Sequence, residues 1–126
     1  MRKLFLLLAL IAAAGASAQK RSFVRVLTYN VCEGLKMDTT ASKERFVAWM
    51  RELDPDLAAL QEMNGFTQAR LEKLAAAYGH SYAVLLKDTG YPVALTSKYP
   101  IVAERVTDNM HHGFLLANTG GYNIVV

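Results

Sequence analysis

Two apolar segments, each ending on an oxygen-bearing side chain, place the strongest constraint on what this chain can fold into. The first is 24–30, which ends at Asn30, and the second is 56–62, which ends at Glu62. A helical stretch and a proline separate them, which is the layout of a strand–helix–strand unit with two parallel strands. Because parallel strands end at the same edge of a sheet, we expect Asn30 and Glu62 to lie side by side. An amide oxygen and a carboxylate, completed by waters and a phosphate, form a Mg²⁺ site.

The rest of the pattern predicts an α/β fold. A helix is predicted over 41–53, because its apolar residues recur at helical spacing, and a second helix over 67–78, with Gly79 just beyond its end. Short strands are predicted at 81–86, 93–97, 101–106, 113–118 and 122–126. The order is βαβα followed by a meander of strands. This order is typical of an α/β sandwich that pairs parallel strands first and antiparallel strands afterwards.

Three segments, taken in order, resemble the motifs of the endonuclease/exonuclease/phosphatase superfamily. They are the strand Leu27–Val31, the block Asp54–Glu62 and the segment Gly90–Ile101. The resemblance runs from about residue 25 to residue 126. It implies the N-terminal half of a four-layer α/β sandwich, in which two mixed β-sheets are flanked by helices.

The resemblance also implies a chemistry. In this superfamily the Asn and the Glu of the first two motifs hold a divalent metal, so Asn30 and Glu62 inherit the role of ligands for Mg²⁺ or Mn²⁺. The implied activity is hydrolysis of phosphoric esters, of phosphodiesterase, endonuclease or phosphatase type. Implied substrates are nucleic acids, nucleotides, phospholipid headgroups and inositol phosphates, and no stable protein partner is inferred. The alternative is that Asn30 caps a turn and Glu62 is a solvated strand end.

Motifs that the superfamily carries later have no counterpart in this chain. They are a Thr-His segment, a Gly-Asp-Xaa-Asn motif and an Asp-His pair, which supply the phosphate-contacting and catalytic residues. We therefore expect 19–126 to be a truncated N-terminal part of the domain that holds metal ligands but no catalytic residue. Expressed alone, it is expected to be inactive, to lack the second sheet and to self-associate. The alternative is a non-catalytic remnant or phosphate-binding module of the same fold.

Residues 1–18 predict a signal peptide. A basic start precedes the eleven-residue apolar run Leu4–Ala14, which is too short to span a bilayer, and Ala16–Ala18 fits the small-residue cleavage rule. The predicted location is periplasmic or secreted, and the alternative is an uncleaved membrane anchor. Removing Arg2 and Lys3 leaves 12 of the 14 basic residues against 11 acidic ones, a net charge of +1. That charge excludes binding of nucleic acid through a broad basic patch.

The sequence also allows predictions for four further side chains. His111 and His112 rarely bind one ion together, because neighbouring residues on a strand point to opposite faces. His112 is the one that could approach the strand ends and contact a phosphate, and a solvated loop pair is the alternative. Cys32, the single cysteine, is expected to be a small buried residue beside the first strand, and a free thiol or an intermolecular bridge is the alternative. Lys98, which precedes a turn, is expected to be solvated, and contact with a substrate is the alternative.

Overall fold

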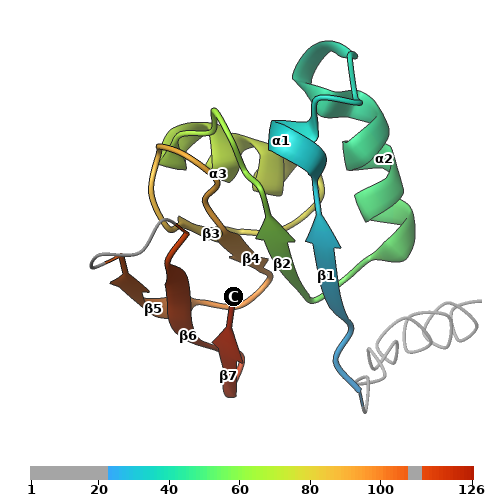
Figure 1. Cartoon of the computed structure of the whole chain (residues 1–126). Coiled ribbons are helices and arrows are strands. Elements are labelled where there is room, and N and C mark those ends of the chain that lie inside the picture. The colour runs from blue at the N-terminus through green and yellow to red at the C-terminus, as the bar shows by residue number, and fades with distance from the viewer. Residues whose placement is uncertain (1–22, 108–111) are drawn as a thin grey trace, which may run out of the picture.

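The computed structural model describes residues 23–107 and 112–126, and its strands form two sheets (Figure 1). The first sheet has the order β1 (Val26–Asn30), β2 (Leu57–Gln61), β4 (Ala94–Ser97) and β3 (Tyr82–Leu85). β1 and β2 run parallel, whereas β4 is antiparallel to both β2 and β3. The predicted parallel pair is thus confirmed. The predicted signal peptide, 1–18, lies outside the described residues.

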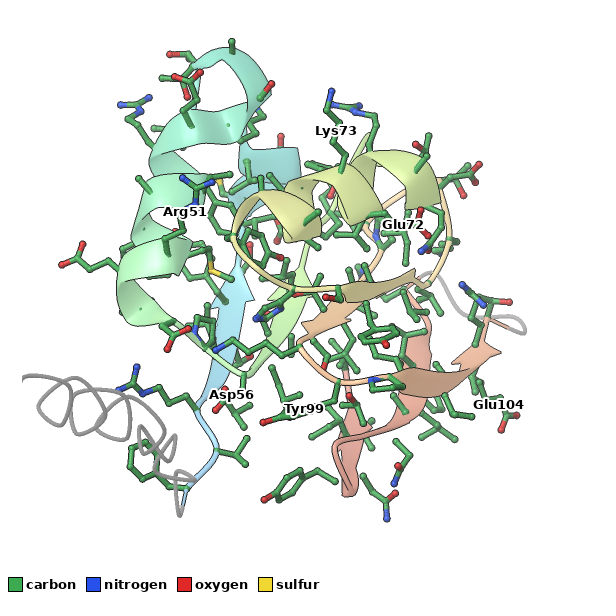
Figure 2. The ribbon with its side chains drawn as sticks, turned by 180° about the vertical axis from the view of Figure 1, so that it is seen from behind. Arg51, Asp56, Glu72, Lys73, Tyr99 and Glu104 are labelled. Carbon is green, nitrogen blue, oxygen red and sulfur yellow. The ribbon has the colours of Figure 1, made fainter. Side chains whose placement is uncertain are left out.

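Helices cover one face of the first sheet (Figure 2). A short helical turn, α1 (Cys32–Leu35), follows β1 and leads through the 3₁₀ helix η1 (Ala41–Lys43) into α2 (Glu44–Leu53), and α3 (Gln68–Ala77) follows β2. The residues that α2 and α3 bury against the sheet are Phe46, Val47, Met50, Leu71, Leu74 and Ala75. Across the two described ranges, no helix has both the length and the apolar character needed to cross a membrane.

A chain of buried polar groups joins the end of α3 to β4. His80 is 1% exposed, with Nδ1 2.8 Å from Thr96 Oγ1 and Nε2 2.8 Å from the Pro55 carbonyl oxygen. The Tyr78 hydroxyl lies 2.9 Å from the same Thr96 oxygen. Burial lowers the pKa of His80 and raises the pKa of Tyr78 to about 12, so both are neutral at pH 7. Because a carbonyl only accepts, His80 Nε2 is assigned the proton, Nδ1 accepts from Thr96, and Thr96 accepts from Tyr78.

A second, antiparallel sheet packs on the other face of the first. It consists of β5 (Ile101–Val106), β6 (Phe114–Thr119) and β7 (Tyr122–Val125). The expectation that the second sheet is missing is therefore wrong, since alternate residues of these strands turn inward and form a second core together with residues of the first sheet. The buried residues of that core are Leu86, Leu95, Leu115 and Ala117.

The outward face of the second sheet carries apolar side chains. Val102 is 76% exposed, Leu116 40% and Val125 71%. Register places Val125 opposite Leu116, so these two form part of one surface. An exposed apolar sheet face of this kind favours association. Self-association of the chain nevertheless stays a prediction.

Lys98 is held in an ion-pair cluster at the end of the first sheet where β2 begins. Its Nζ lies 2.6 Å from Asp54 Oδ1 and 3.1 Å from Asp56 Oδ1, and Asp56, labelled in Figure 2, is buried. The expectation of a solvated Lys98 is wrong, because the turn after β4 brings the ammonium group over two carboxylates from a distant part of the chain. This cluster stabilises the fold at the end of β2 opposite to Glu62.

Candidate metal site at the ends of two parallel strands

The candidate site lies where β1 and β2 end beside each other. Asn30 is the register partner of Gln61, so Asn30 and the next residue along, Glu62, share one edge of the sheet. The amide nitrogen of Asn30 donates a hydrogen bond to Glu62 Oε1 at 2.9 Å. The fold thus brings the two expected ligands together, and their role in holding a metal stays a prediction.

Main-chain N–H groups of the turn after β1 orient both side chains. The Cys32 N–H donates to Asn30 Oδ1 at 2.9 Å, and the Glu33 N–H donates to Glu62 Oε2 at 3.1 Å. The Asn30 amide is thereby fixed, with its oxygen toward Cys32 and its nitrogen toward the carboxylate. Both oxygens of Glu62 accept hydrogen bonds, one from a neighbouring strand end and one from the backbone.

The turn that provides these donors has a left-handed backbone. The three non-glycine residues of α1 and Glu62 itself all have φ between 50° and 61°. Each such residue costs about 1–2 kcal/mol relative to an ordinary conformation. The Gly34 N–H, which donates to the Glu62 carbonyl at 2.7 Å, ties the turn to the end of β2. Strain of this kind, held in place by hydrogen bonds, is concentrated at functional sites in proteins.

The hydrogen bonds also set the charge of the site. The bond from Asn30, followed by that from the Glu33 N–H, holds the pKa of the Glu62 carboxyl below its ordinary value. The nearby positive charge of Lys36 acts in the same direction. Lys36 in turn pairs with Glu33 at 3.0 Å. Glu62 is therefore a carboxylate at neutral pH, with the Lys36 ammonium group near it.

Most of the chain matches one protein family. A profile of the Endonuclease/Exonuclease/phosphatase family matches residues 27–123, a range that includes both Asn30 and Glu62. The chain belongs to this family. No curated protein matches the sequence.

Two solved structures share the family fold with this chain. An AP endonuclease from Archaeoglobus fulgidus superposes with a TM-score of 0.59 and 18% identity, over 82% of this chain and 40% of that one. A humanized D. rerio TDP2 carrying 14 mutations superposes with a TM-score of 0.55 and 18% identity, over 81% of this chain and 44% of that one. At such identity the likeness shows the fold alone. The chain spans less than half the length of either structure.

The donor atoms of this family member fit a hard divalent cation. Asn30 Oδ1 and both Glu62 oxygens have acceptor capacity left beyond the hydrogen bonds they make. Within the described parts of the chain, no three His, Cys, Asp or Glu residues gather into a cluster that could hold a metal alone. Mg²⁺ usually binds through one or two carboxylates while keeping waters and substrate oxygens. The residues present therefore suit Mg²⁺ or Mn²⁺ held in that partly hydrated manner.

His112 lies near this edge of the sheet but outside the Asn30–Glu62 pair. Its ring centroid is 6.2 Å from that of Tyr91, and the two rings meet edge to face. The segment that carries Tyr91 is fixed beside the site, because the Pro92 carbonyl accepts from the Met63 N–H at 2.9 Å. The expected contact of His112 with a phosphate stays a prediction. His111 lies outside the described residues.

The turn after β1 places Cys32 differently from the expectation. Cys32 is exposed, so the expectation of a buried thiol is wrong. Val31 takes the buried position instead, at 3% exposed, and the left-handed turn then directs Cys32 to the surface.

Sequence reasoning missed Gly34, although a glycine so soon after a strand signals an unusual backbone. A Cβ on Gly34 would lie 2.1 Å from the Asn64 carbonyl oxygen.

Replacing Gly34 by alanine is therefore expected to lower the free energy of unfolding and to disturb the site. Gly65 is the matched control, since its φ of +70° is close to the +71° of Gly34 but nothing lies within 4 Å of its Cβ position. Gly65→Ala should cost about 1–2 kcal/mol for the backbone conformation alone. Gly34→Ala should cost at least about 1 kcal/mol more, because the Asn64 backbone must also move. Urea unfolding of both variants measures the difference, and equal losses would contradict the close approach.

Proposed function

We propose that this chain is the N-terminal part of an exported, Mg²⁺-dependent phosphoric ester hydrolase of phosphodiesterase, endonuclease or phosphatase type. The observation that carries the proposal is the hydrogen-bonded pair of Asn30 and Glu62 at adjacent strand ends, in a member of this family. An AP endonuclease among the structural neighbours supports nucleic acid as one candidate substrate. Nucleotides, phospholipid headgroups and inositol phosphates are the others.

Each residue of the site has a definite part in this proposal. Asn30 and Glu62 would hold the Mg²⁺, which, when bound, supplies the positive charge that offsets the anionic oxygens of the ester. Because Asn30 is neutral, the pair contributes a single negative charge, and the loaded site keeps a net attraction for an anionic substrate. Lys36 adds positive charge beside the same edge. The group that activates water is proposed to lie outside 19–126.

Metal binding by this chain tests the proposal. Titration with Mn²⁺, followed by the electron paramagnetic resonance signal of the free ion, should show one ion bound per chain. Glu62→Gln should weaken binding at least about tenfold, because it removes the site's carboxylate. Glu33→Gln is the matched control, since the Glu33 side chain pairs with Lys36 and only its backbone N–H contacts Glu62. Equal losses in the two variants would contradict a metal site on Glu62.

A second candidate is a module that binds phosphate or metal without turnover. It is favoured by the small donor set at this edge, where one carboxylate and one amide face each other. The two candidates separate in a single assay with bis(p-nitrophenyl) phosphate, applied to the protein as its native host produces it. Binding of Mn²⁺ together with turnover supports the hydrolase, and binding with no turnover supports the second candidate.

Export is tested on the same native material. Cleavage after Ala18 should leave a chain that begins at Gln19, because the Ala16–Ala18 segment fits the small-residue rule of signal peptidase. Intact-mass spectrometry of protein from the periplasm or medium reads the N-terminus directly. A mature chain that still begins at Met1 would contradict the proposal of a cleaved signal peptide.

A further inference from the structure

An apolar groove with a basic rim runs between η1 and α3, separate from the Asn30–Glu62 pair. Its volume is about 610 Å³, within the range of small-molecule sites. Phe66 and Leu74, exposed by only 4% and 6%, contribute the buried part of its lining, and Ala76 and Ala77 extend it along α3. The groove therefore offers an apolar surface that a narrow chain could enter.

The charged groups that line the groove are all positive. Lys43, Arg70 and Lys73 line it together with Ser42, and no acidic residue is among its lining residues. Lys73 projects from α3, as Figure 2 shows, and within the described residues it makes no ion pair. An anion at this rim would therefore meet three cations and no competing carboxylate from the lining.

Two of the three cations are held in place by the backbone. Lys43 Nζ donates to the Leu35 carbonyl at 3.0 Å and to the Asp38 carbonyl at 2.9 Å. Arg70 donates to the Gly65 carbonyl, and its guanidinium lies 5.0 Å from the centre of the Phe66 ring. Each of these side chains keeps further N–H donors for a ligand. Because their positions are already fixed, less conformational entropy is lost when an anion binds.

We propose that this groove binds a free single-chain anionic amphiphile, with its apolar tail along Phe66 and Leu74 and its head among the three cations. The buried floor argues against a flat membrane surface as the partner, since Phe66 and Leu74 are reached only by a group that enters the groove. The volume suits one small molecule and not a protein element. The proposal goes beyond the phosphoric ester hydrolase proposed above and does not rest on it.

Equilibrium dialysis of the 126-residue chain against decanoate tests the proposal, because it measures ligand bound per chain whether or not chains associate. One decanoate should bind per chain, about tenfold more tightly than decanol, which has the same tail but no charge. Lys73→Gln should weaken decanoate binding severalfold, and Lys73→Arg should restore it. Ala76→Phe, at an exposed position that lines the groove, should abolish binding of both ligands by filling the groove.

Three outcomes would overturn the proposal. Equal binding of decanol and decanoate would remove the role of the cations. Unchanged decanoate binding in Ala76→Phe would show that the ligand binds outside the groove. The outward face of the second sheet is the alternative site, and in that case Val102→Gln would weaken decanoate binding. Binding to vesicles of anionic phospholipid without binding of free decanoate would identify a membrane surface as the partner. Hydrogen exchange should meanwhile slow in 66–77 when decanoate binds.

Discussion

Glu62→Gln is expected to lower Mg²⁺-dependent hydrolysis of bis(p-nitrophenyl) phosphate by at least about 10²-fold in the protein as its native host produces it. Glutamine has nearly the shape of glutamate and can still accept a hydrogen bond from the Glu33 N–H. It has no negative charge, however, and its amide replaces one carboxylate oxygen that faces Asn30. The variant therefore removes the negative charge of the proposed metal ligand while leaving the fold in place.

The control for this experiment is Glu33→Gln, whose side chain pairs with Lys36 at the surface. Its rate should stay within about threefold of the unchanged protein, because exposed ion pairs contribute little. Raising the Mg²⁺ concentration should restore part of the Glu62→Gln rate if binding of the ion is the lost step. A Glu62→Gln protein with an unchanged rate at low Mg²⁺ would show that Glu62 is not a ligand.

His80→Ala is expected to lower the free energy of unfolding by about 3–5 kcal/mol. The substitution empties a fully buried site and leaves the Pro55 carbonyl and the Thr96 hydroxyl without their shared partner. Tyr78→Phe is the milder comparison, since it removes only one hydroxyl group from the same series of buried hydrogen bonds. It should lower the free energy of unfolding by about 1 kcal/mol. Urea unfolding of the two variants checks both values, and a loss below about 1 kcal/mol for His80→Ala would contradict the hydrogen-bonded role of the ring.

The same histidine predicts a pH dependence. Burial lowers the pKa of His80 in the folded protein below the ordinary value of 6.5, and the positive charge of Lys98 acts in the same direction, while Asp56 opposes it. The unfolded chain therefore takes up a proton at about pH 6.5 that the folded chain does not. The contribution of neutral His80 to the free energy of unfolding is therefore complete above about pH 6.5. It decreases as the pH falls below that value, until the pKa of His80 in the folded protein is reached. His80→Gln should weaken this decrease between pH 7 and pH 5.

The first half of the fold could be predicted from the sequence because its signals are local and repeated. The spacing of Phe46 and Met50 predicts a helix that packs against a sheet, and the structure buries both residues. The apolar segments that end at Asn30 and Glu62 predict parallel strands, and β1 and β2 pair in that way. Proximity of the two side chains then follows from the direction of the strands. The proximity of Asn30 and Glu62 can therefore be predicted without knowing which distant residues are in contact.

Other features depend on information that the side-chain pattern does not contain. Cysteine and glutamate rarely adopt left-handed backbone, so their presence at positions 32 and 33 does not indicate such a turn. The exposed thiol of Cys32 therefore cannot be predicted from the sequence. The pairing of Lys98 with Asp54 joins residues 44 positions apart, which no local pattern can indicate. The second sheet differs, because the sequence predicts its three short strands but carries no signal that they cover the first sheet.

The hydrogen bond from the Glu33 N–H to Glu62 has a consequence for how this site can change. Orientation of the carboxylate depends on the peptide group and not on the side chain at position 33, which points to Lys36 at the surface. The Glu33 side chain can thus be exchanged for another that tolerates left-handed backbone, whereas Gly34 cannot be replaced without moving Asn64. Substitutions at position 33 would therefore change the surface beside the proposed metal ligand while keeping the N–H group that orients Glu62.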